Sequence, residues 1–143
     1  LTHAFLPDLK ELGEGFIMNT ASMEATLPLP YKAVYTGTKN FVYYFSLSLS
    51  QEVRKFGIKV SILCPGPVLT NEEGLKRIES QGKKARLMML YPDQVARRAV
   101  RHMLKGDLLI HPGKMNWWIT KTHKFIPMGI KMRLLEKMFR AYT

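Results

Sequence analysis

The chain has 143 residues, 46% of them hydrophobic and 23% charged, which is the balance of one soluble globular domain and excludes a chain that is disordered throughout. Its single cysteine, Cys64, excludes an internal disulfide framework and favours a cytoplasmic protein, and no uncharged run exceeds 12 residues, too few to span a membrane. Of the net charge of +11, residues 71–143 carry +10, with sixteen Lys and Arg against six Asp and Glu. Because these cations stand in ones and twos and not in a long run, and no nucleic-acid-binding module is present, nucleic acid is not expected as a partner.

The first half of the chain predicts a helix, a strand and a second, longer helix. Apolar residues recur on one face of residues 1–12, as in an amphipathic helix that ends at Gly13. Residues 16–18 form a short apolar run typical of a buried strand, and a polar loop follows. Residues 35–56 contain no proline and are apolar on nearly all sides. This helix must be covered on more than one face, for example by a sheet on one side and a partner subunit on the other.

The second half predicts two more strands, with a third helix between them. Residues 58–64, Ile-Lys-Val-Ser-Ile-Leu-Cys, are the clearest strand, because a nearly continuous apolar run is typical of a strand buried on both faces. Residues 71–90 are polar and without a strong period, which is typical of a mobile lid or a short helix. A helix begins at residues 91–93 and ends at Gly106, and residues 108–111 form a short strand.

This alternation of helices and strands is the signature of an α/β fold with a parallel sheet. Three strands are few for such a sheet, and the chain begins inside a helical pattern without an initiator methionine. We therefore expect a fragment of a larger α/β domain, in which residues 1–113 form one unit and residues 114–143 form a separate tail.

The tail, residues 114–143, is predicted to be helical and basic, in two pieces divided by Pro127 and Gly129. It has seven Lys and Arg but one acid, two tryptophans, and an apolar stripe that recurs every four residues, at Ile130, Leu134, Met138 and Tyr142. Two interpretations stay open. The tail is an interfacial membrane anchor, which would make the protein peripheral to a membrane, or it is a helix pair that packs on the domain or closes its substrate pocket.

A tyrosine and a lysine carry the clearest chemistry in the sequence. In Tyr35-Thr36-Gly37-Thr38-Lys39 they stand four residues apart, on one face at the start of the long helix. A tyrosine alone is a poor acid and a poor base at neutral pH, but a neighbouring ammonium stabilises its phenolate. The pair therefore predicts a proton donor and acceptor for a carbonyl or an alcohol. Because this spacing also arises by chance, a partly buried tyrosine beside a solvated lysine is the alternative.

Two further segments are predicted to lie near this pair. Ser22 follows the first strand, 13 residues before Tyr35, and residues 65–70, Pro-Gly-Pro-Val-Leu-Thr, follow the second strand. Side chains at the carboxyl ends of parallel strands converge on the crevice where an α/β sheet binds its ligand. We therefore expect Ser22, Tyr35 and residues 65–70 at one edge of the sheet.

Taken in order, Asn19-Thr20-Ala21-Ser22, Tyr35-x-x-x-Lys39 and Cys64-Pro65-Gly66-Pro67-Val68-Leu69-Thr70 resemble the second half of a short-chain dehydrogenase/reductase. The resemblance covers about residues 1–113. It implies the C-terminal part of a Rossmann-like, doubly wound parallel sheet, and hydride transfer between NAD or NADP and a small carbonyl or alcohol substrate. It also implies a homo-oligomer that pairs through the helix at residues 35–56.

The resemblance assigns a role to each candidate residue. Tyr35 would be the general acid/base, Lys39 would stabilise its phenolate and hold the nicotinamide ribose, and Ser22 would hydrogen-bond the reacting oxygen. Ser22, Tyr35 and Lys39 are thus the candidate catalytic residues. The candidate cofactor-binding residues are Tyr35, Lys39, Pro65, Gly66, Val68 and Thr70.

Several parts of the family pattern are absent from these 143 residues. They include the glycine-rich turn that receives the cofactor's pyrophosphate and the Asn-Ala-Gly strand end. We therefore expect the isolated chain to bind NAD or NADP poorly. A non-catalytic protein that acts as a dimer or at a membrane surface is the alternative function. No His-Glu-x-x-His or Cys-x-x-Cys pattern occurs, so no metal site is expected.

Overall fold

The computed structural model describes residues 1–69 and 89–140. Its helices and strands are α1 (Thr2–Leu12), β1 (Gly15–Thr20), α2 (Ala33–Val53), β2 (Ile58–Leu63), α5 (Pro92–Lys105), β3 (Leu109–Ile110), α6 (Lys114–Thr122) and α7 (Met128–Phe139). The described residues also form three short 3-10 helices, η1 (Met23–Thr26), η2 (Arg54–Phe56) and η3 (His123–Phe125). The predicted α/β alternation is confirmed. Residues 71–90, predicted to be a mobile lid or a short helix, lie outside the described residues except for the last two.

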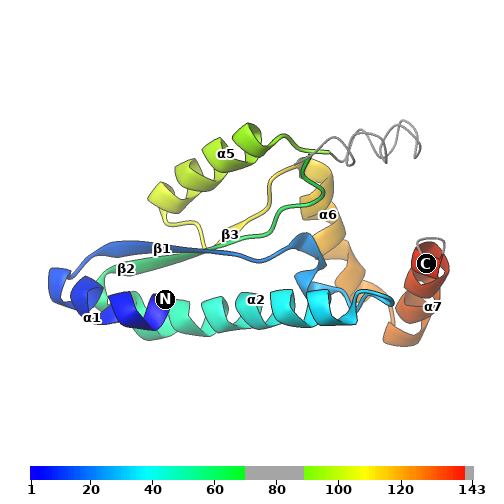
Figure 1. Ribbon diagram of the computed structural model, residues 1–143, viewed down its shortest axis with the longest axis horizontal. Helices are drawn as coiled ribbons and strands as arrows, with labels where there is room; N and C mark the ends of the chain where they lie inside the picture. Colours follow the sequence, from blue (N-terminus) through cyan, green and yellow to red (C-terminus); the bar gives the residue numbers. More distant parts are fainter. Residues whose placement is uncertain (70–88, 141–143) are drawn as a thin grey trace.

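The sheet is parallel and has the order β1-β2-β3. β1 pairs with β2 along its whole length, from Gly15 opposite Ile58 to Thr20 opposite Leu63. α1 and α2 cover one face of the sheet and α5 covers the other (Figure 1), as in a doubly wound sheet. All three strands therefore end at the same edge, where the loops before α2 and after β2 meet.

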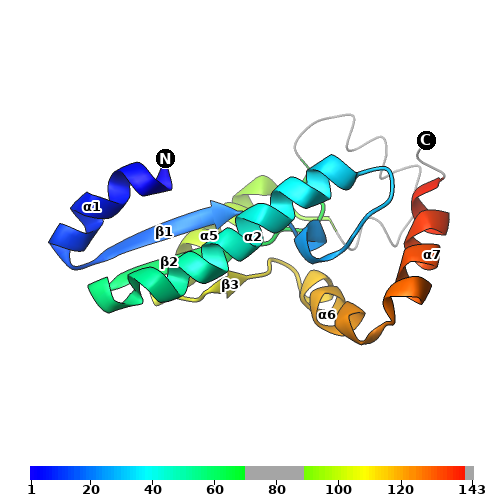
Figure 2. The same ribbon diagram turned by 90° about the horizontal axis from the view of Figure 1, so that it is seen from below.

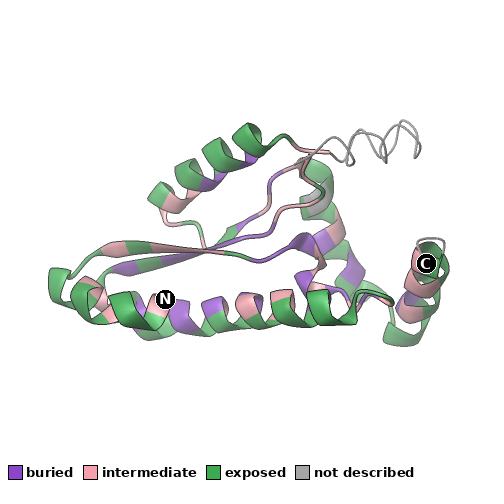
Figure 3. Ribbon diagram, in the orientation of Figure 1, coloured by how far each residue is buried: buried purple, intermediate pink, exposed green. Residues whose placement is uncertain are grey.

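β2 lies at the centre of the core, as its continuous apolar run predicts. Every residue of Ile58–Leu63 except Lys59 is buried. Ile58, Val60 and Ile62 alternate along the strand and pack against side chains of α2, whereas Leu63 packs against α5 and β3. Figure 3 shows the buried residues gathered on β2 and on the side of α2 that faces the sheet.

The turns that end α1 and η2, the short helix that continues α2, approach each other closely at the opposite end of the sheet. Gly13 and Gly57 both have φ +72, a left-handed conformation that favours glycine at a helix end. A Cβ atom on Gly57 would lie 2.1 Å from the carbonyl oxygen of Gly13. The close approach of these two turns therefore depends on a residue without a side chain.

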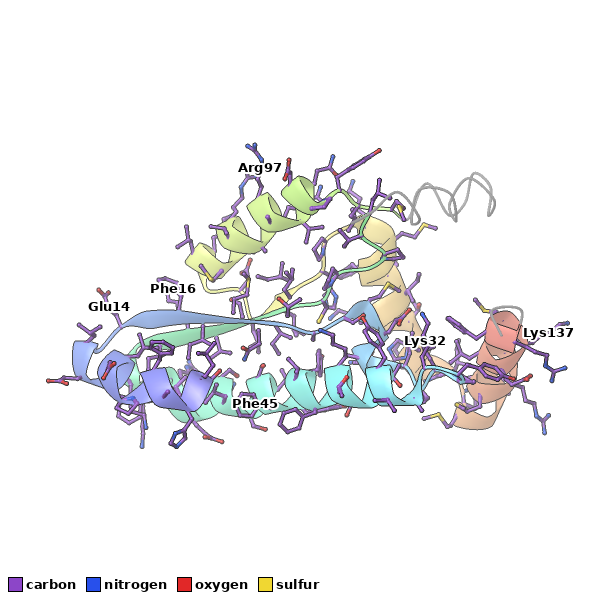
Figure 4. All side chains as sticks on the ribbon, viewed as in Figure 1. Glu14, Phe16, Lys32, Phe45, Arg97 and Lys137 are labelled. Atoms are coloured by element: carbon purple, nitrogen blue, oxygen red, sulfur yellow. The ribbon has the colours of Figure 1, made fainter. Side chains whose placement is uncertain are left out.

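The long helix α2 is covered by the sheet on one side and leaves an aromatic face on the other. Tyr43, Leu49 and Val53 are buried against the sheet. Phe41, Tyr44 and Phe45 are exposed at 68%, 56% and 41%, and the rings of Phe41 and Phe45 stack with centroids 5.9 Å apart. Figure 4 shows Phe45 pointing away from the sheet. The predicted cover by a sheet is confirmed, and cover by a partner subunit stays a prediction.

The basic tail is helical, as predicted, but the break between its two helices differs from the predicted one. α7 begins directly after Pro127, but Gly129 lies inside this helix and does not divide the tail. The interruption between α6 and α7 is instead formed by η3 and the two residues that follow it. Within the part of the chain that the structure describes, no helix is both long enough and apolar enough to cross a bilayer.

Candidate active site

Ser22 lies where the chain leaves β1. Its side chain is buried and caps η1, because Ser22 Oγ accepts a hydrogen bond from the Glu24 amide at 3.1 Å. This bond occupies an oxygen lone pair and not the hydroxyl proton. Ser22 therefore keeps a donor that can point at the oxygen of a substrate.

Backbone hydrogen bonds continue the pairing of β1 and β2 past the last strand residues. The Ala21 amide donates to the Leu63 carbonyl at 2.8 Å, and the Met23 amide donates to the Pro65 carbonyl at 2.9 Å. These two bonds flank Ser22 on both sides along the chain. They hold it beside the turn that starts at Pro65, at the carboxyl edge of the sheet.

Tyr35 and Lys39 lie in the first two turns of α2 and share one helix face. Lys39 Nζ donates a hydrogen bond to the carbonyl oxygen of Thr20, the last residue of β1, at 3.0 Å. The Tyr35 side chain is 44% exposed and thus accessible to a ligand. Figure 2 shows α2 starting near the carboxyl end of β1 and running back along the sheet. The lysine therefore ties the start of α2 to the strand that leads to Ser22.

The turn after β2 is held in place from both sides. The Cys64 amide donates to the Ile110 carbonyl at 2.8 Å, so the turn begins pinned to β3. Further along, Val68 and Leu90 form a parallel bridge, in which the Leu90 amide donates to the Pro67 carbonyl at 3.1 Å. The candidate residues Pro65, Gly66 and Val68 therefore belong to a fixed turn at the same edge as Ser22. Thr70 lies outside the described residues.

Three side chains, those of Asn40, Thr26 and His123, form contacts that hold the segment from Ser22 through η1 in place. No pattern in the sequence predicts these contacts. Asn40 Nδ2, one residue after Lys39, donates to the Ala25 carbonyl at 2.9 Å. A hydrogen bond of 2.9 Å joins Thr26 Oγ1 to His123 Nε2, across 97 residues. Burial, with the charges of Lys131 and Lys124, lowers the pKa of His123, so its ring stays neutral at physiological pH. These contacts position η1 from α2 and from the tail.

The thiol of Cys64 is a core group at this edge and not a nucleophile. Burial raises the pKa of Cys64 to about 12, and a hydrogen bond with the Ser22 backbone opposes that shift only in part. The thiol is therefore protonated at neutral pH. Among residues 1–69 and 89–140, no three His, Cys, Asp or Glu side chains gather closely enough to hold a metal ion.

The family model described as short chain dehydrogenase matches residues 1–80, which is more than half of the chain. The chain belongs to the short-chain dehydrogenase family. This confirms the family that the motifs resemble, and the matched segment contains Ser22, Tyr35, Lys39 and the turn after β2. The relatives are oxidoreductases.

Two relatives among the curated proteins align with nearly the whole chain. A very-long-chain 3-oxoacyl-CoA reductase of Laccaria bicolor is 29% identical over 147 residues, which cover 100% of this chain and 40% of the reductase. The uncharacterized oxidoreductase YbbO of Escherichia coli K12 is 34% identical over 146 residues, which cover 95% of this chain and 54% of YbbO. The chain thus spans about half, or less, of the length of these relatives.

Solved structures share the fold. A structure of a 7β-hydroxysteroid dehydrogenase superposes with a TM-score of 0.81 at 20% identity, covering 94% of this chain and 52% of that one. A short chain dehydrogenase from Burkholderia cenocepacia, solved in complex with NADP, superposes with a TM-score of 0.72 at 20% identity, covering 93% and 52%. These likenesses confirm that the chain has the Rossmann-like fold of short-chain dehydrogenases. In this family the fold accommodates a nicotinamide cofactor.

Proposed function

We propose that this chain carries the catalytic residues of an oxidoreductase that interconverts a carbonyl compound and an alcohol with NAD or NADP. The proposal is supported by one observation above all: the hydrogen bond from Lys39 to the end of β1 brings the start of α2 to the edge that holds Ser22 and the Pro65 turn. Segments that are far apart in the sequence meet there, at the edge where α/β sheets bind ligands.

The side chains at this edge suit a nicotinamide cofactor. Lys39 Nζ uses one proton on the Thr20 carbonyl and has two more to donate, and the Tyr35 hydroxyl is at an accessible position. These donors would hold the ribose, while Pro65, Gly66 and Val68, with Thr70, would border the nicotinamide end. When bound, the cofactor supplies or accepts the hydride.

The chain's own residues would handle the proton and the oxygen. Ser22 donates its hydroxyl hydrogen bond to the substrate oxygen and holds it in place. Tyr35 gives its proton to that oxygen during reduction and takes a proton back during oxidation. The Lys39 ammonium stabilises the phenolate that remains on Tyr35 between these events. The alkoxide that would otherwise form is thereby neutralised as it develops.

Cofactor oxidation by the complete protein tests this reaction class. We expect the absorbance of NADH or NADPH to fall when ketones or aldehydes are added, and to rise from NAD or NADP when the corresponding alcohols are added. The comparison of the two cofactors also identifies the one used. A folded protein that transfers hydride in neither direction, with aliphatic, aromatic and long-chain substrates alike, would contradict the proposal.

A second copy of the protein is the proposed partner of the exposed aromatic face on α2. Phe41→Glu is expected to shift a wild-type dimer or tetramer toward monomer in sedimentation velocity, because a carboxylate would be buried at the interface. Leu104→Glu, on α5 at the opposite side of the sheet, is the matched control and should leave the assembly intact. A wild-type protein that sediments only as a monomer would exclude this interface.

A further inference from the structure

The tail presents an apolar face to solvent. Six large apolar residues of the tail, between 52% and 88% exposed, are together called the tail face here: Trp118 on α6, Phe125 on η3, and Met128, Ile130, Leu134 and Met138 on α7. Ile130, Leu134 and Met138 follow each other at intervals of four and share one side of α7, and Arg133 and Lys137 flank them there. Figure 4 shows Lys137 pointing away from the rest of the molecule. Apolar and cationic groups therefore lie on the same side of this helix.

The other side of α7 faces the domain, where Lys131 is buried and Met132, Leu135, Glu136 and Phe139 are half-buried. Lys131 is only 8% exposed, although lysine is among the residue types least often buried. The Tyr31 hydroxyl donates to Glu136 Oε1 at 3.0 Å, and Lys32 Nζ lies 5.0 Å from the centroid of the Phe139 ring. These contacts fix the helix with its apolar stripe turned outward.

The single acidic residue of the tail does not neutralise the cations that flank the apolar stripe of α7. Residues 114–143 contain seven Lys and Arg and a single carboxylate, Glu136. That carboxylate accepts hydrogen bonds from Arg140 Nε at 2.8 Å and from Tyr31, and these bonds lower the pKa of Glu136. It stays ionised and engaged with its neighbours. The tail face therefore combines exposed apolar groups with positive charge.

We propose that the tail face binds the anionic surface of a lipid bilayer. α7 has 12 residues, too few to cross, so it lies in the interface with Ile130, Leu134 and Met138 among the lipid chains. Trp118 and Phe125 suit the boundary between headgroups and chains, and the cations attract anionic headgroups. A second copy of this chain fits less well, because two faces of the same charge repel each other.

Vesicle co-sedimentation tests this binding, which is independent of turnover. The protein should pellet with phosphatidylcholine vesicles that contain phosphatidylserine but not with pure phosphatidylcholine, and added salt should weaken the binding. The variant Arg133→Glu/Lys137→Glu should lower the partition coefficient at least about tenfold. Its control, Arg97→Glu/Arg101→Glu, makes the same charge change at the same spacing on α5, away from α7 (Figure 4), and should bind within about twofold of wild type.

A second pair of variants tests the apolar part of the face. Leu134→Ser/Met138→Ser should abolish pelleting, because the helix would lose its insertion into lipid. Val100→Ser/Leu104→Ser, an exposed pair at the same spacing on α5, is the control and should pellet like wild type. All four positions are exposed, so melting curves should stay close to that of wild type.

Three results would each overturn the proposal. The wild-type protein fails to pellet with anionic vesicles, it pellets equally with neutral ones, or both tail variants bind like their α5 controls. If the tail variants instead change the sedimentation coefficient without lipid present, the face is an interface between copies of the protein.

Discussion

Tyr35→Phe is expected to lower the turnover number by a factor of about 10²–10⁴ while leaving the fold intact, because the change removes the proton donor alone. The side chain is 44% exposed at the start of α2, so the loss of its hydroxyl should change the melting temperature little. Turnover is measured in the complete protein with saturating cofactor and substrate, and folding by thermal melting.

Tyr44→Phe is the matched control for this substitution. Tyr44 lies on the same helix and is also exposed, but it belongs to the aromatic face and not to the carboxyl edge of the sheet. It should keep near wild-type turnover. If the Tyr35 variant retains more than about a tenth of the wild-type rate, the general acid/base role is wrong.

Gly57→Ala is expected to lower the free energy of unfolding by about 2–4 kcal/mol, the sum of two costs. An alanine is strained at φ +72, and its Cβ would lie 2.1 Å from the Gly13 carbonyl oxygen. That oxygen belongs to the backbone, so the two helix-ending turns must move apart to make room. Urea denaturation of the 143-residue chain measures the change.

Gly13→Ala separates these two costs. Gly13 has the same φ of +72, but a Cβ there would meet no atom within 4 Å. Its substitution should therefore cost only the backbone strain, about 1–2 kcal/mol. Equal losses for the two variants would mean that the contact between the turns of α1 and α2 contributes nothing to stability.

Local patterns predicted the order of helices and strands and placed the candidate site residues at the carboxyl edge of the sheet. Residues 58–64 were predicted to be a strand buried on both faces because each apolar side chain of a continuous run is stabilised by burial. In the structure every residue of β2 except Lys59 is buried. Tyr35 and Lys39 share a face because helical geometry alone decides this. Ser22 and Pro65 follow parallel strands, which end at one edge. These inferences depend only on the pattern of residues that are close together in the sequence.

Long-range contacts decided what periodicity leaves open. The stripe at Ile130, Leu134 and Met138 is visible in the sequence, but its spacing is the same whether it turns inward or outward. Its outward orientation follows from the Tyr31–Glu136 hydrogen bond, made across 105 residues, and from the burial of Lys131. The Thr26–His123 hydrogen bond and the approach of Gly57 to Gly13 are of the same kind. Periodicity sets which residues share a face, whereas contacts between distant segments set which faces meet.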